Sequence, residues 1–497
     1  MLHRCARRLS LLLLLAIMAT PVSAQQRANN RRNQNAATDR LNVVVIFSDD
    51  LTASALSCYG NSICQTPNLN RLASEGVLFQ NAYCQMPLCG PSRASLMSGL
   101  YPNRTKMLKN SSVSGSYRAL NPELANHPSI GGFFREQGYQ SVRVSKIFHM
   151  GIPGGIVAGT PDGDDPDSWD VAFNVMAPEH HAEGDLDLLT PKRQHYGSNF
   201  SRLRIDDARD ETQADVLASR QAVACLESLK AGQKPFFLAI GLVRPHVPLV
   251  SPARWFDRYS PDAIKLPEWT EEELKRVPAP ALTMRNGPRY GMNEEQQRQA
   301  VAAYYACVSY MDEQVGRILD ALDRLKLREK TIVVFMSDHG YQLGEHDCWQ
   351  KLSLFEPSAR VPLLISAPGS KYLTGAVSKQ IVESIDLYPT LAELTGLAEK
   401  APQILQGQSL VPELLAEKAK TDSPQRREVA YTVTLEDGES IRTPQWRYTR
   451  WGNGEEELYD EVADPAERKN LAADPQRAQQ LAELRILLEQ TRRRSLE

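Results

Sequence analysis

Short apolar segments that lead into polar or charged residues restrict the fold of this sequence more than any other feature. Five of them recur along the chain: 41–47, 139–144, 235–243, 331–336 and 361–366. Continuous apolar segments of this length are typical of strands that are buried on both faces of a sheet. Four of the five lead into chemically active side chains: Asp49-Asp50, Lys146-Ile147-Phe148-His149, Arg244-Pro245-His246 and Asp338-His339.

Helical patterns separate these predicted strands. The clearest spans 295–326, where apolar residues such as Tyr304, Val308 and Met311 recur every three or four positions. Alternating strands and helices predict an α/β fold with a large, mostly parallel sheet between helices. Ligands of such sheets bind beyond the carboxyl ends of the strands, so we expect the polar strand ends to converge in one crevice.

The chain is long enough for one large core and a smaller partner. We assign residues 41–415 to a catalytic domain and the polar segment 416–427 to a linker. Residues 428–497 contain short β-like segments and a final charged helix. This pattern predicts a C-terminal α+β subdomain with an antiparallel sheet.

The first 24 residues have the composition of a secretory signal peptide. Arg4, Arg7 and Arg8 precede an apolar segment, which ends at the small-residue pattern Val22-Ser23-Ala24. Residues 25–40 then form a polar leader without apolar periodicity, which we expect to be flexible. No later segment approaches the roughly 20 apolar residues that a membrane span needs. We therefore expect a secreted or periplasmic protein with no integral membrane segment after signal cleavage.

The charge balance argues against nucleic acid as the target. The chain has 57 basic and 60 acidic residues, and a formal net charge of -3. Loss of the signal segment with its arginines makes the balance more acidic, whereas nucleic-acid-binding proteins carry basic surfaces. An anionic substrate would therefore need a local basic pocket.

Three aspartates at strand ends predict a metal site. Asp49, Asp50 and Asp338 offer hard oxygen ligands that suit calcium or magnesium, and His339 lies beside them. Two aspartates before a loop often only stabilise a turn, but the expected convergence of strand ends favours a metal. Residues 160–170 are also acidic, but they lack the spacing of an EF-hand, and we expect a solvated loop there.

Four further residues supply positive charge and titratable protons: Lys146, His149, His246 and Lys351. A single exposed lysine is usually solvated, and a single histidine is often structural. Placed together on strand ends and adjacent loops, the four fit a pocket that binds an oxyanion.

Cys89 precedes Gly90-Pro91-Ser92-Arg93 at the start of a predicted helix. Pro91 suits the first helical position, so Cys89 would lie at the helix entrance, where backbone N–H groups favour an anion. Arg93, one turn later, could brace that anion. The other interpretation is an incidental cysteine, since free cysteines mostly lie in cores.

The segment from Cys89 to Arg93 resembles the Cys-x-Pro-Ser-Arg signature of type I sulfatases, in which the cysteine is oxidised to Cα-formylglycine. Further segments resemble that family in the same order: 46–50, 145–149, 244–248, 304–323, 337–351 and 457–472. The segment 244–248 and the loop that ends at Lys351 most resemble iduronate-2-sulfatases. The resemblance implies the alkaline-phosphatase-like sulfatase fold.

The resemblance also implies roles for individual residues. Asp49, Asp50, Asp338 and His339 match the calcium site of the family, with the converted Cys89 as a further contact. Lys146 and His149 match residues that hold the modified side chain and the sulfate, and Arg93 matches the arginine that supports it. His246 and Lys351 match groups that face the ester oxygen, with His246 as general acid.

The implied activity is hydrolysis of a sulfate ester on a sulfated oligo- or polysaccharide, at the 2-position of a uronic acid. A formylglycine hydrate would provide the nucleophile, so a formylglycine-generating (sulfatase-maturing) enzyme is an implied partner. The chain departs from the family pattern at Ser98-Gly99-Leu100, where Thr-Gly-Arg is usual, and in the unmatched segments 179–181 and 259–293. Two alternatives stay open: a phosphodiesterase or phosphonate hydrolase on the same fold, and a non-catalytic secreted glycan-binding protein.

Overall fold

The computed structural model of the chain describes residues 40–190, 199–232, 234–285, 287–415 and 427–497. Residues 40–497 form one compact unit. The predicted signal peptide (1–24) lies outside the described residues, as do the leader except Arg40 and the linker except Arg427. The boundaries drawn at 415 and 428 stay predictions.

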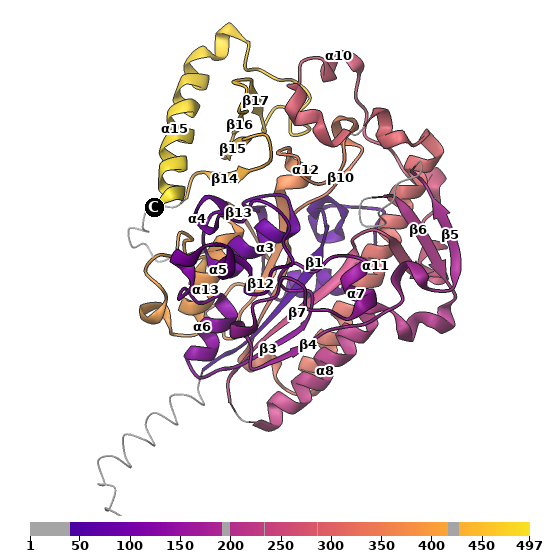
Figure 1. Cartoon of the computed structure of the whole chain (residues 1–497), viewed down its shortest axis with the longest axis vertical. Helices are drawn as coiled ribbons and strands as arrows, with labels where there is room; N and C mark the ends of the chain where they lie inside the picture. Colours follow the sequence, from indigo (N-terminus) through magenta and orange to yellow (C-terminus); the bar gives the residue numbers. More distant parts are fainter. Residues whose placement is uncertain (1–39, 191–198, 233, 286, 416–426) are drawn as a thin grey trace, which may run out of the picture. The chain divides into compact units, whose positions relative to one another are not determined.

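An eight-stranded sheet forms the centre of this unit (Figure 1). Its strands in spatial order are β13 (Ala376–Glu383), β2 (Val77–Tyr83), β12 (Arg360–Ser366), β9 (Thr331–Ser337), β1 (Asn42–Asp49), β7 (Phe236–Pro245), β3 (Gln140–Ser145) and β4 (Val171–Phe173). β1 pairs in parallel with β7 and β9, and β3 pairs in parallel with β7 and β4. β12 runs antiparallel to both of its neighbours. The predicted α/β class with a largely parallel sheet is confirmed.

Helices cover both faces of the sheet because its central strands alternate two sets of apolar side chains. Val44 and Ile46 of β1 face a core shared with α2 (Pro67–Ser74), α8 (Ala214–Gly232) and α11 (Glu294–Arg324). Val43 and Val45 face the opposite core, shared with α3 (Cys89–Ser98), α5 (Ser116–Leu120), α6 (Ile130–Glu136) and α13 (Leu387–Leu394). These strands are buried on both faces, which explains their continuous apolar sequences.

Smaller elements surround this three-layered centre. They include two minor sheets, β5 (Gly184–Leu188) with β6 (Ser201–Ile205) and β8 (Leu249–Pro252), and β10 (Gln342–Leu343) with β11 (Trp349–Gln350). The short helices are α4 (Pro102–Thr105), α7 (Gly154–Ala158), α9 (Ala253–Phe256), α10 (Glu271–Leu274), α12 (Glu356–Ala359) and α14 (Val411–Leu414). Among the helices that the structure describes, none is both long and apolar enough to cross a membrane.

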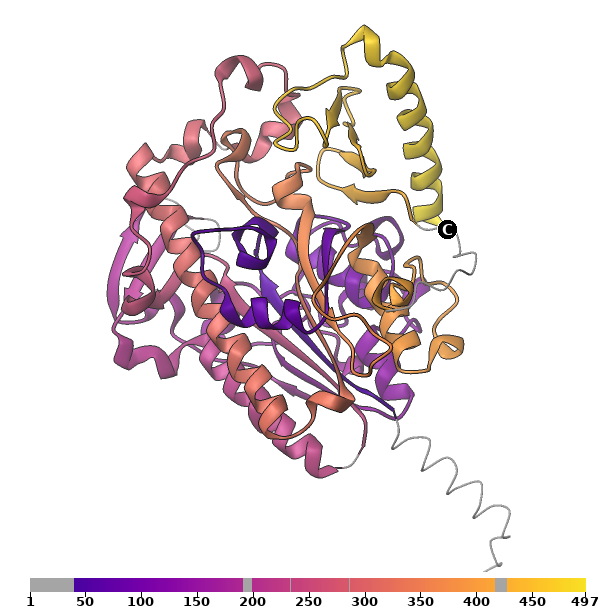
Figure 2. The same cartoon turned by 180° about the vertical axis from the view of Figure 1, so that it is seen from behind.

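The C-terminal residues form the predicted antiparallel sheet and helix (Figure 2). Its strands are β14 (Ala430–Val433), β15 (Glu439–Arg442), β16 (Trp446–Arg450) and β17 (Glu456–Asp460), followed by α15 (Ala478–Leu496). Leu481, Leu484 and Leu488 of α15 share a core with the apolar residues of these strands. Arg427, in the predicted linker, is paired with Glu383 and with Asp386 (2.9 Å). These ion pairs fix the chain to the end of β13 just before it enters the C-terminal sheet.

Candidate active site

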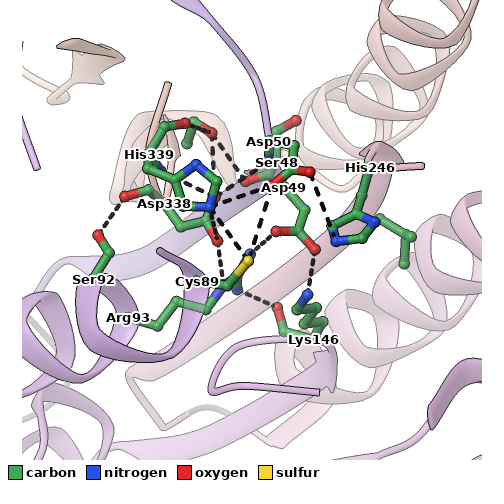
Figure 3. A network of polar contacts seen from close by, with 12 residues as sticks. Ser48, Asp49, Asp50, Cys89, Ser92, Arg93, Lys146, His246, Asp338 and His339 are labelled. Atoms are coloured by element: carbon green, nitrogen blue, oxygen red, sulfur yellow. Dashed lines mark hydrogen bonds and ion pairs between the residues drawn. The ribbon is translucent and has the colours of Figure 1, made fainter. Parts of the chain in front are cut away.

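The carboxyl ends of β1, β3, β7 and β9 lie at one edge of the central sheet and bring the predicted site residues together. Asp49 and Asp50 follow from β1, Lys146 from β3, His246 from β7, and Asp338 and His339 from β9. Figure 3 shows these side chains directed at one another and at Cys89 of α3. The expected convergence of strand ends is therefore present.

Each of the three buried aspartates has a cationic partner. Asp49 contacts the Lys146 ammonium group, Asp50 Oδ1 accepts from Lys351 Nζ at 2.6 Å, and Asp338 Oδ2 accepts from Arg93 Nε at 2.8 Å. Burial alone would raise the pKa of Asp49, but Lys146 and Arg93 hold it well below its usual value. Neighbouring cations likewise lower the pKa of Asp50, so these two carboxylates stay charged although they are buried.

Two carboxylate oxygens remain without a donor. Asp49 Oδ1 and Asp50 Oδ2 are buried and have no hydrogen-bond partner among the described residues. Ligand atoms of Asp49, Cys89, Asp338 and His339 all lie within 4.8 Å of one another. Buried anionic oxygens are costly unless they are paired or coordinate a cation, so these residues fit a hard divalent metal ion.

Cys89 is the first residue of α3, so the helix begins two residues before the predicted first position at Pro91. Proline is tolerated there because the N–H groups of the whole first turn lack intrahelical acceptors. The Gly90 N–H donates to Asn110 Oδ1 at 2.8 Å, so one of these donors is already satisfied. A side chain at residue 90 would collide with Asn110, which explains the glycine.

The surroundings of the Cys89 sulfur favour a negative charge there. Sγ lies 3.2 Å from Lys351 Nζ and 3.3 Å from His339 Nε2. Burial by itself raises the pKa of this thiol, but Lys351 and Lys146 outweigh it and lower the pKa to about 6. For His339, burial opposes the charge, but Asp338 and Cys89 raise the pKa to about 9.

Arg93 connects three of the strand ends. Besides Asp338, its guanidinium donates through Nη1 to the carbonyl oxygens of Lys146 (2.8 Å) and Ile147 (3.0 Å). Its Nη2 lies 3.5 Å from Asp49 Oδ1. Ser92, the preceding residue of the Cys-x-Pro-Ser-Arg segment, donates from Oγ to the Asp338 carbonyl. Ser92 and Arg93 thus fix α3 to the ends of β3 and β9.

A pocket of about 330 Å³ opens above this cluster. Its lining residues are Cys89, Asn110, Lys146, His149, Met150, Gly151, Ile152, His246, Gln350, Lys351 and Leu352. His149, which is mostly buried, has its pKa lowered to about 3 by burial and by Lys146, so its imidazole is neutral. The sequence analysis missed Asn110 and Gln350, because neither follows a strand or carries a charge.

The segment that carries Lys351 has an unusual backbone. Gln350 and Leu352, on either side of the lysine, have φ angles of 75° and 69°, in the left-handed region that non-glycine residues rarely adopt. The Leu352 N–H donates to the Pro87 carbonyl at 2.9 Å and holds this segment next to the start of α3. Backbone strain of this kind is typical of functional sites whose surroundings enforce it.

Comparison with known proteins agrees with this geometry. Residues 41–397 match the sulfatase family model, and residues 344–494 match the model described as the C-terminal region of N-sulphoglucosamine sulphohydrolase. The chain belongs to the sulfatase family. As a sulfatase it is a sulfuric ester hydrolase, and the central sheet with its C-terminal antiparallel sheet is the alkaline-phosphatase-like fold of that family.

Relatives of this sulfatase include enzymes named for 2-sulfates. The chain is 31% identical to iduronate 2-sulfatase of Mus musculus, over 91% of this chain and 94% of that protein. It is 32% identical to a Δ4,5-hexuronate-2-O-sulfatase of Bacteroides thetaiotaomicron, over 91% and 89%. Among solved structures, a 2-O GAG sulfatase aligns with a TM-score of 0.69 and 28% identity, covering 92% of both chains.

The structure shows where three further features of the sequence lie in this sulfatase: Leu100, residues 160–170 and Glu179. Leu100, where the family pattern has arginine, is fully buried in the core beside α3. The solvated loop expected at 160–170 is only partly present: Pro161, Asp167 and Asp170 are exposed, but Asp164 pairs with Arg143 at 2.9 Å and Asp165 is buried. Glu179 of the unmatched segment 179–181 is also fully buried.

Proposed function

We propose that this sulfatase removes the 2-sulfate from a uronic acid residue of a sulfated oligo- or polysaccharide, after Cys89 is converted to Cα-formylglycine and calcium is bound. The observation that carries the proposal is the position of Cys89. Its side chain lies at the floor of the pocket, between Lys351 and His339, next to two carboxylate oxygens without donors. A modified residue there meets both a cation site and bound substrate.

Asp49, Asp50, Asp338 and His339 would hold the calcium ion. Their oxygen-rich donor set is the kind that calcium prefers. When bound, calcium supplies positive charge that stabilises an anionic nucleophile and a sulfate oxygen. Arg93, paired with Asp338, keeps one of these acids in place.

Lys146 and His149 face the pocket from the end of β3 and would bind the sulfate group. Lys146 offers a charged donor, and its pairing with Asp49 keeps the ammonium at the floor of the pocket. His149 is neutral because burial and Lys146 lower its pKa to about 3. The neutral ring would accept a hydrogen bond from the modified side chain, and we propose it as the base when sulfate is released.

His246 and Lys351 would act on the departing sugar oxygen. His246 Nδ1 lies 2.6 Å from the Val247 carbonyl oxygen, which places a proton on that nitrogen and leaves Nε2 to face the site. A protonated Nε2 can donate to the sugar oxygen while the S–O bond breaks, and Lys351 can stabilise negative charge on it.

The size of the pocket and the names of the relatives support the proposed substrate class. A pocket of about 330 Å³ is at the small end of ligand sites and suits one sulfated sugar residue. Relatives that cover most of the chain are named for iduronate and hexuronate 2-sulfates. The composition of residues 1–24 supports export, so an extracellular or periplasmic glycan is the expected substrate.

Two measurements test this proposal. Mass spectrometry of the peptide that bears Cys89, from protein made in the native host, should show the mass of formylglycine. Purified protein should then release sulfate fastest from a uronate 2-sulfate disaccharide, compared with a glucosamine 6-sulfate disaccharide and with phosphate and phosphonate esters. An unmodified thiol would contradict the mechanism, and faster phosphonate or phosphodiester hydrolysis would favour the rival function.

A further inference from the structure

Glu179 is a buried acid with no role in the mechanism above. It begins a short 3₁₀ helix, Glu179–His181, and its φ of 48° is in the left-handed region. Both of its carboxylate oxygens accept from Nη2 of Arg244, at 2.7 and 2.6 Å. Arg244 is itself 2% exposed, so the pair is isolated from solvent. A buried pair of this kind strongly fixes the geometry of both partners.

Arg244 extends this pair to the residues on both sides of His246. Its Nη1 donates to the carbonyl oxygens of His246 and Pro248, each at 3.0 Å. The described hydrogen bonds of the two guanidinium Nη atoms therefore go either to Glu179 or to the backbone that carries His246.

The backbone before His246 is fixed as well. Asp215 at the start of α8 accepts from the N–H groups of Val243 (2.6 Å) and Arg244 (3.0 Å). Ser48 Oγ on β1 donates to the Arg244 carbonyl at 2.8 Å. The backbone is thus held up to Arg244. The part that follows is held by the His246 N–H, which donates to the Val243 carbonyl at 2.9 Å, and by the guanidinium, which Glu179 orients.

The imidazole of His246 depends on this backbone for its direction. Nδ1 is bonded to the neighbouring Val247 carbonyl, and Nε2 lies 3.7 Å from Asp50 Oδ2 (Figure 3). A rotation of the 246–248 backbone would therefore move Nε2 away from the pocket. Misplacement of a catalytic group by about 1 Å can cost a hundredfold in rate.

We infer that Glu179 is a positioning residue, which acts through Arg244 to direct His246 at the leaving oxygen of the substrate. The inference rests on the proposed role of His246 as general acid. It also gives segment 179–181, which matched no family motif, a specific part in the reaction. A purely structural ion pair would instead affect every substrate and step alike.

Substrates with different leaving groups separate these two roles. A sugar hydroxyl needs a proton as it leaves, whereas 4-nitrophenolate leaves without one, so general-acid loss affects mainly the sugar substrate. For Glu179→Gln in the full-length protein, we expect kcat on a uronate 2-sulfate disaccharide to fall about 10- to 100-fold, with KM changed less than about threefold. Hydrolysis of 4-nitrophenyl sulfate should change less than about threefold. His246→Ala should show the same difference, enlarged.

Matched controls separate this effect from the loss of any ion pair. Asp257 pairs with Arg204 through both oxygens (2.6 and 3.1 Å) on the surface, and Asp257→Asn should leave both substrates unaffected. Asp386 is a buried acid paired with Arg427, and Asp386→Asn should lower Tm without separating the substrates. Glu179→Asp keeps the buried charge but shortens its reach, so the variant should fold. Its loss of kcat on the sugar substrate should exceed its loss on 4-nitrophenyl sulfate by about 3- to 10-fold.

The outcomes are distinguishable. Equal losses on both substrates in the Glu179 variants, with the difference present in His246→Ala, would overturn the positioning role and leave the proposed function intact. If His246→Ala itself shows no difference between the substrates, the general-acid assignment fails, and the inference fails with it. The formylglycine content of each variant, measured on the Cys89 peptide, ensures that equally matured enzymes are compared.

Discussion

Two buried charge clusters in this sulfatase contain similar residues, but they differ in how fully their charged atoms are paired within the protein. The first surrounds Cys89 at the carboxyl edge of the central sheet. The second joins the C-terminal sheet to α12, and we call it the Arg447 cluster: Glu356, Arg442, Arg447, Glu461 and Glu467. Both are largely buried, so each has to satisfy most of its charges internally or with a ligand.

The Arg447 cluster pairs most of its charged atoms within the protein. Glu461 Oε1 has no hydrogen-bond partner among the described residues, but it lies 3.4 Å from Arg447 Nε. Glu467 accepts from Arg447 Nε at 2.5 Å through one oxygen and from the Glu356 N–H at 2.7 Å through the other. Glu356 accepts from Tyr83 and from both arginines. Three carboxyl groups face two arginines, and burial together with Glu467 and Glu356 raises the pKa of Glu461 to about 9, so this group carries a proton.

The cluster around Cys89 keeps oxygens of Asp49 and Asp50 without a hydrogen-bond donor in the described part of the chain and opens to a pocket. Nitrogen atoms of Arg93 and His246 lie 3.5 Å and 3.7 Å from these oxygens, and the proposed calcium ion and sulfate would complete the site. The comparison teaches that burial of charge is not by itself a sign of function. Incomplete internal pairing next to a cavity is the more informative feature.

The largest expected effect is loss of activity without loss of fold in the Cys89 cluster. Cys89→Ala should lower kcat/KM for sulfate release at least about 10⁴-fold, because the modified side chain is the proposed nucleophile. The free energy of unfolding should change by less than about 1 kcal/mol. Sulfate-release kinetics measure kcat/KM, and urea unfolding measures the free energy of unfolding. Cys307→Ala, at a buried cysteine in α11, serves as control and should keep its activity.

Removal of the metal should affect the same cluster. A calcium chelator should lower activity about 10³-fold and the free energy of unfolding by about 3 to 4 kcal/mol, if calcium is supplied at 100 to 1,000 times its Kd. Added calcium should restore both. Asp49→Asn should abolish this response, since it removes the negative charge of one proposed calcium ligand. Stability that is the same with and without calcium would contradict the metal assignment.

The Arg447 cluster should respond in the opposite way. Glu467→Gln leaves the buried Arg447 without one of its two hydrogen-bonded acids, so the free energy of unfolding should fall by about 3 kcal/mol. Activity measured well below the unfolding transition should stay within about threefold, and the calcium response should persist. Glu273→Gln, in the surface pair with Arg468, should cost less than about 1 kcal/mol. An activity loss in Glu467→Gln without a loss of stability would break the distinction between the clusters.

The smallest effect is a pH dependence from Glu461. Its pKa in the folded protein, about 9, is above its ordinary value of 4.5, so the folded state binds this proton more tightly. The resulting stability is complete below about pH 4.5 and is lost as the pH rises through about 9. Between pH 7 and 9, we expect a loss of about 1 kcal/mol per pH unit.

Glu461→Gln, which imitates the protonated acid, should flatten this pH dependence in urea unfolding at several pH values. Glu399→Gln, at an exposed position, should not. The same slope in wild type and Glu461→Gln would mean that the proton is bound elsewhere.

The sequence alone predicted the fold class, and it predicted the residues that the structure brings together around Cys89. Strands that are buried on both faces require continuous apolar segments, and ligands bind where such strands end. The two acids of β1 and the Asp338-His339 pair could therefore be placed together from the sequence. The segment from Cys89 to Arg93 and its ordered companions identified the family. These signals are local, which is why they can be read along the chain.

Only the tertiary structure decided how the charges pair. Arg93 meets Asp338 across 245 residues of sequence, and Glu179 meets Arg244 across 65. No local pattern encodes such a partner, because any acid could meet any arginine until packing brings two of them together. The start of α3 at Cys89, the burial of Asp165 and the roles of Glu179 and Glu467 depend on such packing. The order of residues sets which groups are available, and packing sets which of them keep atoms without a hydrogen-bond partner beside the pocket.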